Sequence, residues 1–309
     1  MSGLAASLAA ESLTAPPASL APPPVRRARL LGPSIRLDGR INAIRRDIAD
    51  IALSDRLFAS RYVVPEPAGC AAPAAMLRDA PSADAPAVSQ LLHGEAFALL
   101  DVTDGWAWGY GLHDHYVGYI AAEALGAPIE ASHVVTAPRA PVFAAADIKA
   151  PVVAIWPIGA RFAGTQQGDF VETLTGYVHR RHAGSLPIPE RDPVAVAERL
   201  VGTPYVWGGR GGGGVDCSGL VQLALGLAGI AAPRDSDQQQ ALGAPIATGE
   251  ALRRGDLIFF PGHVGIMVDP ENMVHANAHW MAVAIEPLAD IVARLAGTHA
   301  EPVIARRRI

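Results

Sequence analysis

The most informative stretch for the fold of this chain is residues 203 to 220, Thr-Pro-Tyr-Val-Trp-Gly-Gly-Arg-Gly-Gly-Gly-Gly-Val-Asp-Cys-Ser-Gly-Leu. A glycine-rich turn here delivers a lone cysteine, Cys217, to an apolar segment that ends at Gly229. The length and composition of that segment favour a buried helix over a strand. We therefore expect Cys217 in the first turn of a helix. Free backbone N–H groups and the helix dipole lower the pKa of a thiol there and make it a nucleophile.

Two histidines downstream complete a possible catalytic set. Residues 254–268 predict two strands broken at Pro261-Gly262, with His263 opening the second strand, and the apolar run that follows carries His275. If these strands pair as a hairpin, the two histidines can lie side by side across the ladder. Cys217 would then attack, His263 would act as general base and later as general acid, and His275 would orient His263 through its far ring nitrogen.

Five short motifs in one order carry a family resemblance. They are Pro204-Tyr-Val-Trp-Gly-Gly, Asp216-Cys-Ser-Gly, Arg254-Gly-Asp-Leu, Gly262-His-Val-Gly-Ile and Val274-His-Ala. Together they resemble the NlpC-type papain-like cysteine peptidases, which cut bacterial cell-wall peptides. Any single motif is weak, whereas five in register are highly specific.

An internal repeat precedes the catalytic region. Ala85-Pro86, Gly94 and Phe97 recur as Ala150-Pro151, Gly159 and Phe162 at a constant offset of 65 residues. Short β-rich runs between Gly, Asp and Pro turns suit small barrels. The repeat resembles bacterial SH3-like modules, which commonly accompany NlpC-type catalytic domains, and we count two.

The chain of 309 residues is long enough for two or three domains at roughly 150 residues each. We expect a multi-domain protein in which two small all-β SH3-like barrels precede an α+β papain-like domain. The predicted divisions are a disordered arm at 1–36, a short helix and linker at 37–73, a first SH3-like module at 74–128, a second at 129–184, and the NlpC-type peptidase domain at 185–309. The isoleucines between residues 41 and 51 suggest the helix, and residues 288–295 suggest a last amphipathic helix.

Charge and hydropathy narrow the possible partners. The net charge is −5 with no basic stripe, so we expect no nucleic-acid partner. No apolar stretch reaches the roughly 18 residues that span a bilayer, so we expect no membrane segment. The N-terminus lacks the positive region of a signal peptide. We therefore expect a cytoplasmic protein, with secretion as the alternative, and the sequence does not indicate an oligomeric state.

The two cysteines do not suggest a disulfide, because pairing with Cys70 would consume the nucleophile Cys217. We interpret Cys70 as an incidental small residue near a linker. A metal site built from His263, His275, His279 and Cys217 is chemically possible. The surrounding motifs favour the metal-free peptidase, so we expect no metal and no cofactor.

The remaining site residues follow from chemistry and from the resemblance. The backbone N–H of Cys217 and the hydroxyl of Tyr205 are candidates to stabilise the oxyanion of the reaction. The candidates for binding substrate within the catalytic domain are Asp216, Ser218, Asp235 and Ser236. By resemblance, the first SH3-like module closes the far end of the subsite for L-Ala-γ-D-Glu, with Tyr116 the preferred residue and Trp108 and Glu95 as further candidates.

The resemblance implies a cysteine endopeptidase that hydrolyses the γ-D-glutamyl-diamino acid bond of murein peptides with a free N-terminal L-Ala, in recycling of the cell wall. Three alternatives remain open. The protein could be a secreted hydrolase of intact peptidoglycan, a non-catalytic wall-peptide binding protein, or an acyltransferase. The sequence does not reveal which diamino acid is recognised.

Overall fold

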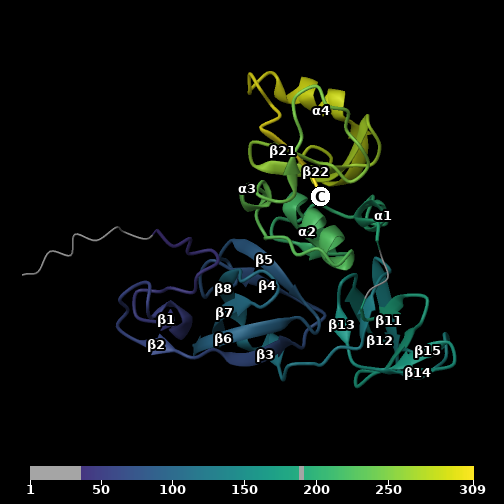
Figure 1. Cartoon of the computed structure of the whole chain (residues 1–309). Coiled ribbons are helices and arrows are strands. Elements are labelled where there is room, and N and C mark those ends of the chain that lie inside the picture. The colour runs from purple at the N-terminus through teal and green to yellow at the C-terminus, as the bar shows by residue number, and fades with distance from the viewer. Residues whose placement is uncertain (1–35, 188–190) are drawn as a thin grey trace, which may run out of the picture. The chain divides into compact units, whose positions relative to one another are not determined.

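The computed structural model describes residues 36–187 and 191–309. Figure 1 shows the chain coloured from purple near the N-terminus to yellow at the C-terminus. The arm predicted for residues 1–36 lies outside the described residues, apart from Arg36. Residues 37–309 form one compact unit with several hydrophobic cores.

The segment from Leu37 to Val63 is mostly irregular. Its elements are β1 (Ala49–Asp50), η1 (Ile51–Leu53) and β2 (Tyr62–Val63). The helix predicted here is wrong, because its isoleucines do not share a buried face: Ile48 is fully buried, whereas Ile41 and Ile51 are exposed. Ile48 packs instead in a small cluster with Trp108 of the first module. The segment is therefore an irregular strap that packs on the first module.

The first module is a seven-stranded antiparallel sheet. In spatial order its strands are β5 (Ala87–Leu92), β4 (Ala74–Arg78), β8 (Val117–Ala121), β7 (Trp106–Gly111), β6 (Ala96–Thr103), β3 (Glu66–Cys70) and β9 (Leu125–Gly126), with η2 (Ala122–Ala124) before the last strand. The sheet begins at Glu66, earlier than the predicted boundary at residue 74. Cys70 is consequently a fully buried strand residue in the core of this module and not a linker residue.

Residues 133–185 form two smaller sheets. The first has the order β13 (Arg161–Phe162), β10 (His133–Val135) and β17 (Ala183–Ser185); the second has the order β12 (Val152–Pro157), β11 (Arg139–Phe143), β16 (Tyr177–His179), β15 (Phe170–Glu172) and β14 (Thr165–Gln167). The repeated positions correspond in structure. Gly94 and Gly159 have φ of 72° and 86°, in the left-handed region that glycine tolerates best, and Phe97 and Phe162 are both buried in their own cores. That this second module is SH3-like stays a prediction.

The C-terminal part combines four helices with a six-stranded sheet. The helices are α1 (Pro193–Glu198), α2 (Cys217–Leu227), α3 (Ser236–Gln239) and α4 (Leu288–Leu295), and the hairpin before α2 is made of β18 (Arg210–Gly211) and β19 (Gly214–Val215). The sheet order is β20 (Ala244–Pro245), β25 (Ala305–Arg308), β21 (Leu257–Phe260), β22 (His263–Met267), β23 (Asn272–Asn277) and β24 (Ala282–Pro287).

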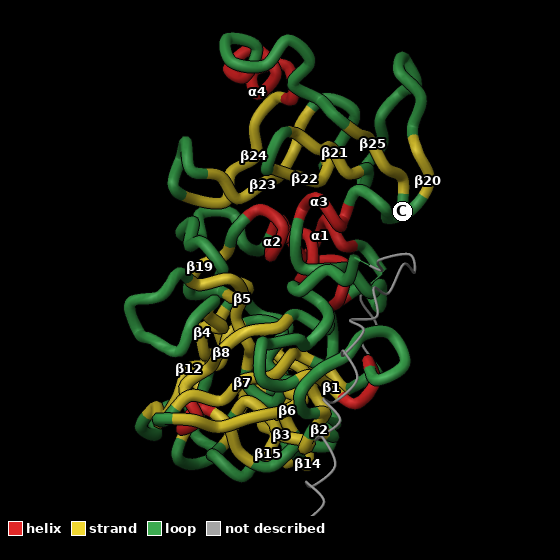
Figure 2. The backbone as a smooth tube through the Cα atoms, turned by 90° about the vertical axis from the view of Figure 1, so that its left-hand side faces the viewer, coloured by secondary structure: helices red, strands yellow, loops and turns green. Residues whose placement is uncertain are grey.

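The strand β21 shows how this sheet is covered on both faces. Alternate side chains of a strand point to opposite faces. Leu257 and Phe259 pack in the core with α1 and α2, whereas Ile258 and Phe260 pack in a separate core with α4. Figure 2 shows the same layers, with α4 on one side of β21–β24 and α1 and α2 on the other.

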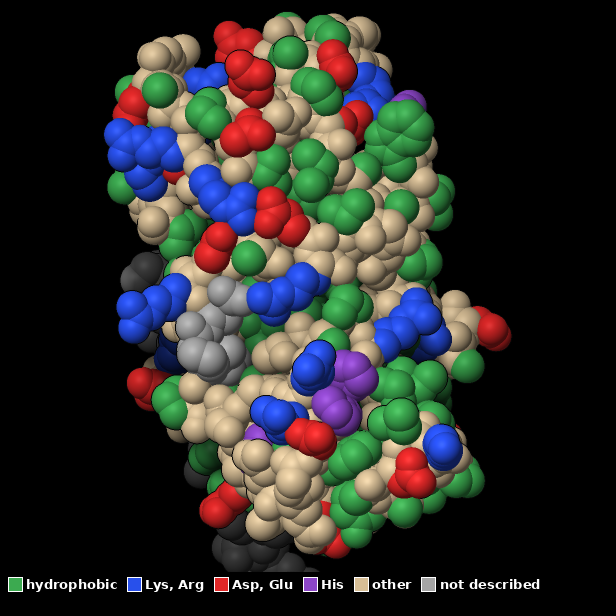
Figure 3. Space-filling model, turned by 90° about the vertical axis from the view of Figure 1, so that its right-hand side faces the viewer, with side chains coloured by type: hydrophobic (Ala, Val, Ile, Leu, Met, Phe, Trp, Pro, Cys, Tyr) green, Lys and Arg blue, Asp and Glu red, His purple; other side chains and the backbone are tan. Residues whose placement is uncertain are grey.

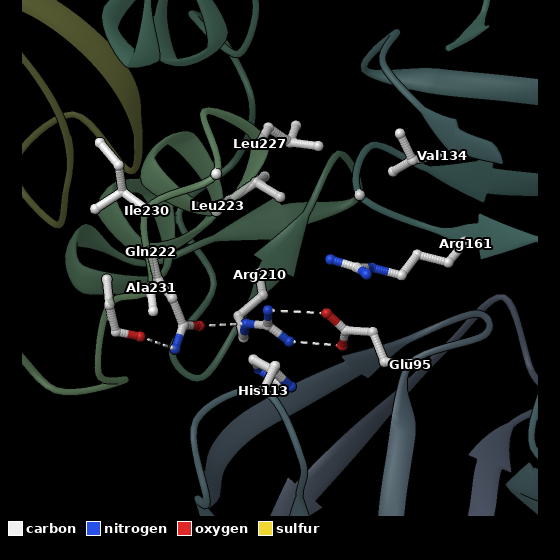
Figure 4. Close-up of a pocket in the computed structure, with 14 residues that line it drawn as sticks. Glu95, His113, Val134, Arg161, Arg210, Gln222, Leu223, Leu227, Ile230 and Ala231 are labelled. Atoms are coloured by element: carbon white, nitrogen blue, oxygen red, sulfur yellow. Dashed lines mark hydrogen bonds and ion pairs between the residues drawn. The ribbon is translucent and has the colours of Figure 1, made fainter. Parts of the chain in front are cut away.

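A buried ion pair joins the first module to the catalytic region. Glu95 lies in the turn before β6 and accepts hydrogen bonds from both terminal nitrogens of Arg210. The Nη1–Oε2 and Nη2–Oε1 distances are 2.8 and 3.0 Å. Arg210 Nε donates to Gln222 Oε1 on α2 at 2.5 Å. Figure 4 shows this row at the wall of a cavity of about 290 Å³. Because both charges are desolvated, each depends on the other for compensation.

Replacing Arg210 by Ala should therefore destabilise the protein, by about 3–5 kcal/mol in urea unfolding, because it leaves Glu95 buried and unpaired. Arg180→Ala is the matched control, since Arg180 pairs with Asp169 at the surface. That control should leave the unfolding midpoint nearly unchanged. Equal midpoints for the two variants would contradict the role assigned to the buried pair.

Candidate active site

Cys217 is the first residue of α2, as the sequence predicts. Asp216 caps the helix by accepting the backbone N–H of Gly219 at 2.7 Å. Glycine is required at 219, because a Cβ there would lie 2.3 Å from the backbone oxygen of Gly209 in the preceding turn. The glycine-rich turn therefore packs directly against the start of the helix and fixes where the thiol lies.

The Cys217 thiol is buried at 6% exposure. Backbone N–H groups of Val264 and Ser218 reach its sulfur and favour the thiolate. Burial, followed by the charge of Asp216, nevertheless raises the pKa of the thiol to about 11. The predicted lowering of the thiol pKa by the helix N-terminus is thus outweighed by these two effects. Since Val264 directly follows His263, the sulfur lies beside the backbone that carries the predicted base.

His263 and His275 lie side by side on β22 and β23, which pair as an antiparallel hairpin. His263 Nε2 is 2.8 Å from His275 Nδ1. Burial and the neighbouring His275 lower the pKa of His263 to about 3, so this ring is neutral at physiological pH. The predicted row of nucleophile, base and orienting residue is therefore assembled on adjacent elements.

Glu286 extends this row and was not foreseen from the sequence. Its Oε1 lies 2.7 Å from His275 Nε2. Its other oxygen accepts from Arg294 at 2.8 Å and from Trp280 Nε1 at 3.2 Å. A signal for it existed: His275 pairs with Ala284 on β24, and Glu286 stands two residues further, on the same face of the sheet.

The carboxylate of Glu286 sets the direction of the hydrogen bonds along the row. A carboxylate only accepts, so His275 Nε2 carries the proton that bonds Glu286. Neutral His275 then accepts at Nδ1 from the Nε2–H of His263. The remaining nitrogen of His263, Nδ1, is left unprotonated and able to take up the thiol proton. The Asn277 amide nitrogen also approaches His275 Nε2, at the longer distance of 3.1 Å.

Tyr205 lies next to the nucleophile, as predicted. It is half-buried and packs against the core that contains Cys217. Burial, followed by the charges of Cys217 and Asp216, raises the pKa of its hydroxyl to about 12. The phenol therefore stays protonated and can donate a hydrogen bond to an oxyanion.

A cavity of about 340 Å³ opens beside the thiol. Six of the predicted residues line it: Tyr116, Asp216, Cys217, Ser218, Asp235 and Ser236. Tyr116 comes from the first module, and its hydroxyl donates to Asp235 Oδ2 at 2.9 Å. The structure thus brings most of the predicted substrate-binding residues into one cavity.

Asp216, Asp235 and Asp237 all line this cavity, and the first two have different roles. Both oxygens of Asp216 are occupied, since Arg234 donates to each of them at 3.0 and 2.5 Å. Gly208 N–H adds a further bond to Asp216 Oδ2 at 2.8 Å. In contrast, Asp235 Oδ1 accepts no hydrogen bond from the described residues. Asp235 is therefore the carboxylate available to a ligand.

Two predicted residues lie elsewhere. Glu95 is paired with Arg210 at the module boundary and lines the other cavity (Figure 4). Trp108 is buried under the guanidinium of Arg45, which lies 4.9 Å from the ring centroid. Neither side chain lines the cavity beside Cys217, because an ion pair occupies Glu95 and buried packing occupies Trp108.

The described residues show few features of other ligand classes. They contain no group of three or more His, Cys, Asp or Glu suited to a metal ion, and His279 contacts Trp280 edge to face. Among the helices described, none has the length and apolar character needed to cross a membrane. On the face in Figure 3, Lys and Arg side chains are scattered among Asp and Glu and do not form a stripe.

Comparison with protein families matches two parts of the chain. Residues 202–293 match the NlpC/P60 family, and residues 77–125 match the bacterial dipeptidyl-peptidase SH3 domain. A probable endopeptidase of Mycobacterium tuberculosis is 40% identical over 98 residues, 31% of this chain and 25% of that protein. A gamma-D-glutamyl-L-lysine dipeptidyl-peptidase of Bacillus cereus is 34% identical over 117 residues, 35% of each chain. The matches thus span about a quarter to a third of these relatives.

The fold is also shared with a solved structure. An NlpC/P60 family protein from Bacillus cereus superposes with a TM-score of 0.67 and 21% identity, over 79% of this chain and 99% of the other. At this identity the likeness shows the fold alone. It extends beyond the catalytic region, because residues 202–293 make up a much smaller share of the chain.

Glu286→Ala should lower kcat by about ten-fold or more, approaching the roughly 10²–10⁴-fold that a general base contributes, with little change in KM. The reason is that His275 loses its acceptor and no longer fixes the proton on His263, while the cavity stays intact. Glu286→Gln keeps an acceptor oxygen without the charge and should recover part of the loss. The measurement is kcat and KM against pH on a peptide substrate.

Glu271→Ala is the control for this series, because Glu271 lies on the turn between β22 and β23 and its side chain lies outside the row of rings. Its kcat should match that of the unaltered protein. An unchanged kcat in Glu286→Ala would refute the orienting role.

Proposed function

Because residues 202–293 form an NlpC/P60 cysteine peptidase domain, we propose that this protein hydrolyses the amide bond between the γ-carboxyl of D-Glu and a diamino acid in short murein peptides that carry a free N-terminal L-Ala. One observation carries the proposal. A single cavity has the thiol of Cys217 in its wall together with the open carboxylate oxygen of Asp235. The first can attack an amide, and the second can bind an ammonium group.

The chemistry follows the row of side chains. Cys217 Sγ forms a bond to the γ-carbonyl carbon as its proton passes to His263, and the oxyanion accepts hydrogen bonds from Tyr205 and the backbone N–H of Cys217. The C–N bond then breaks while His263 gives the proton to the leaving amine. Water attacks the thioester with His263 again as base, which releases the acid and restores the thiol.

The neutral state of the pair of Cys217 and His263 fits this sequence of steps. The pKa of Cys217 is raised and that of His263 is lowered, so at neutral pH the thiol is protonated and the imidazole of His263 is neutral and able to accept a proton. Proton transfer then accompanies the attack, and charge develops only when the oxyanion can accept donors. Burial that disfavours a free thiolate is therefore compatible with catalysis.

Selection of the N-terminus rests on the other wall of the cavity. A free α-amino group is a cation with three donors, and Asp235 Oδ1 offers it a charged acceptor. Ser218 and Ser236 line the same cavity, and serine hydroxyls are donors of the kind that the α-carboxylate of D-Glu needs. Similarity to a relative named gamma-D-glutamyl-L-lysine dipeptidyl-peptidase supports this class of substrate.

The place of this reaction is also part of the proposal. Free short peptides arise when wall fragments are broken down, so the preference for a free N-terminus points to recycling in the cytoplasm. A secreted enzyme acting on intact peptidoglycan would instead have to accept L-Ala whose nitrogen is acylated. Asp235 opposes this, because an acylated nitrogen in that position carries no positive charge to pair with the free oxygen Oδ1 as water is excluded from it.

Mass spectrometry of peptide digests tests the proposal. The protein should release L-Ala-D-Glu from L-Ala-γ-D-Glu-L-Lys or from its diaminopimelate analogue. The N-acetylated peptide should react at least about ten-fold more slowly, because the charge-assisted hydrogen bond from the ammonium group to Asp235 Oδ1 is lost. Preference for the N-acetylated peptide would favour the secreted hydrolase.

Two cysteine variants separate catalysis from folding. Cys217→Ala should abolish release, because no other group near the base can form the thioester. Cys70→Ala should retain activity, because Cys70 is buried in the first module and burial raises the pKa of its thiol to about 12. Full activity in Cys217→Ala would reject the mechanism.

A further inference from the structure

A residue of the N-terminal strap reaches the wall of the catalytic cavity. Arg40 Nη1 donates to Asp235 Oδ2 at 2.8 Å. The same guanidinium holds Asp237 through two bonds of 2.9 Å, one to each carboxylate oxygen. These partners lie nearly 200 residues away in the sequence, on the short segment that begins α3. The strap is therefore directly connected to the carboxylate assigned to the substrate amine.

Arg40 is itself held in place by contacts with β8 and with Asp38. Its backbone oxygen accepts the N–H of Val117 on β8, next to Tyr116, at 2.8 Å. Its Nε and Nη2 donate to Asp38, the latter at 2.8 Å. The hydrogen bond from Arg40 keeps the pKa of Asp38 at about 2, and that of Asp237 is lowered for the same reason. All the groups stay charged at neutral pH, and the guanidinium has little freedom to reorient.

This arrangement determines which oxygen of Asp235 a ligand can use. Oδ2 accepts from both Arg40 and the hydroxyl of Tyr116. No described residue donates to Oδ1, while the residue lines the cavity. With one oxygen anchored by two donors, the carboxylate cannot rotate without breaking a charge-assisted bond. Asp235 is thus held with one oxygen free, which reduces the entropy cost of binding.

The charge of this cluster also suits a cation. Asp38, Asp235 and Asp237 contribute three negative charges and Arg40 one positive charge, which leaves −2. Arg234 does not alter this balance, because Asp216 already neutralises it within the same cavity wall. Arg40 therefore fixes Asp235 without cancelling its attraction for an ammonium group.

We propose that Arg40 is a positioning residue for substrate selection, which holds Asp235 so that its free oxygen receives the N-terminal ammonium group of the peptide. The proposal rests on the proposed function. Arg40 does not line the cavity, so it acts through Asp235 and contributes nothing to the chemistry at Cys217. The N-terminal strap, the first module and the catalytic domain then each supply one part of a single subsite.

A second arginine of the strap provides a matched control. Arg45 bonds Asp47 and Asp101 and stacks on Trp108 of the first module, away from the cavity. It anchors the strap as Arg40 does but has no contact with Asp235. A merely structural effect of loosening the strap should therefore appear in Arg45→Ala as well as in Arg40→Ala.

The experiment compares kcat and KM for the free and the N-acetylated L-Ala-γ-D-Glu-L-Lys, in the full chain and in Arg40→Ala, Arg40→Lys and Arg45→Ala. Arg40→Ala should raise KM for the free peptide about ten-fold with kcat within about two-fold, and leave kcat/KM for the N-acetylated peptide unchanged. Arg40→Lys should restore part of the preference, because an ammonium group can hold Asp235 but cannot form the two-bond fork to Asp237. Arg45→Ala should keep the preference of the unaltered protein.

The outcomes separate the two proposals. If the unaltered protein cleaves neither peptide, the proposed function fails and the role of Arg40 falls with it. If it prefers the free peptide and Arg40→Ala keeps the same ratio, only the positioning role is overturned. Equal losses on both peptides in Arg40→Ala and Arg45→Ala would likewise overturn it, because the strap would then be a structural support. Thermal unfolding of each variant identifies any that fold poorly, and Arg40→Lys decides the question in that case.

Discussion

The ion pair between Asp216 and Arg234 is the interaction on which both ends of the catalytic cavity depend. Arg234 is 1% exposed and donates to both oxygens of Asp216, which also cap α2 and bind Gly208 N–H. Asp216 immediately precedes the nucleophile, and Arg234 immediately precedes Asp235. One buried contact therefore sets the position of the thiol relative to the carboxylate assigned to substrate. Breaking a buried pair is costly because it strands a charge, so this spacing is rigidly maintained.

The site balances two opposing influences on the thiol. The start of α2 and two backbone N–H groups favour a thiolate, while burial and Asp216 favour the thiol, and the second influence is larger. The same Asp216 that positions Cys217 thus makes it less acidic. The hydrogen bonds that run from His263 through His275 to Glu286 offset this lower acidity. They keep the proton of neutral His263 on Nε2 and leave Nδ1 free to accept the thiol proton. Reactivity then comes from alignment of a base more than from a resting thiolate.

Local sequence signals predicted the local structure well. The glycine-rich turn and the apolar run around Cys217 predicted the correct helix, and Pro261-Gly262 marked the correct turn before His263. The predictions failed where tertiary contacts determine the conformation or the partner of a residue. The isoleucines of the strap match a helical spacing by chance, since Ile48 is buried against Trp108 in an irregular segment. Glu95 was correctly assigned to the first module, but only the fold shows that both of its carboxylate oxygens are paired with Arg210.

The residues missed from the sequence are those whose roles need two distant segments at once. Glu286 matters only after β23 and β24 are placed in register, and Arg40 only after the strap meets α3. Chemistry and selectivity therefore have different origins in this chain. The nucleophile, the base and its supports all come from the C-terminal domain, whose motifs are compact in sequence. The proposed subsite for the N-terminus combines Arg40, Tyr116 and Asp235, one from each part of the fold, so the proposed selectivity depends on how these parts are joined.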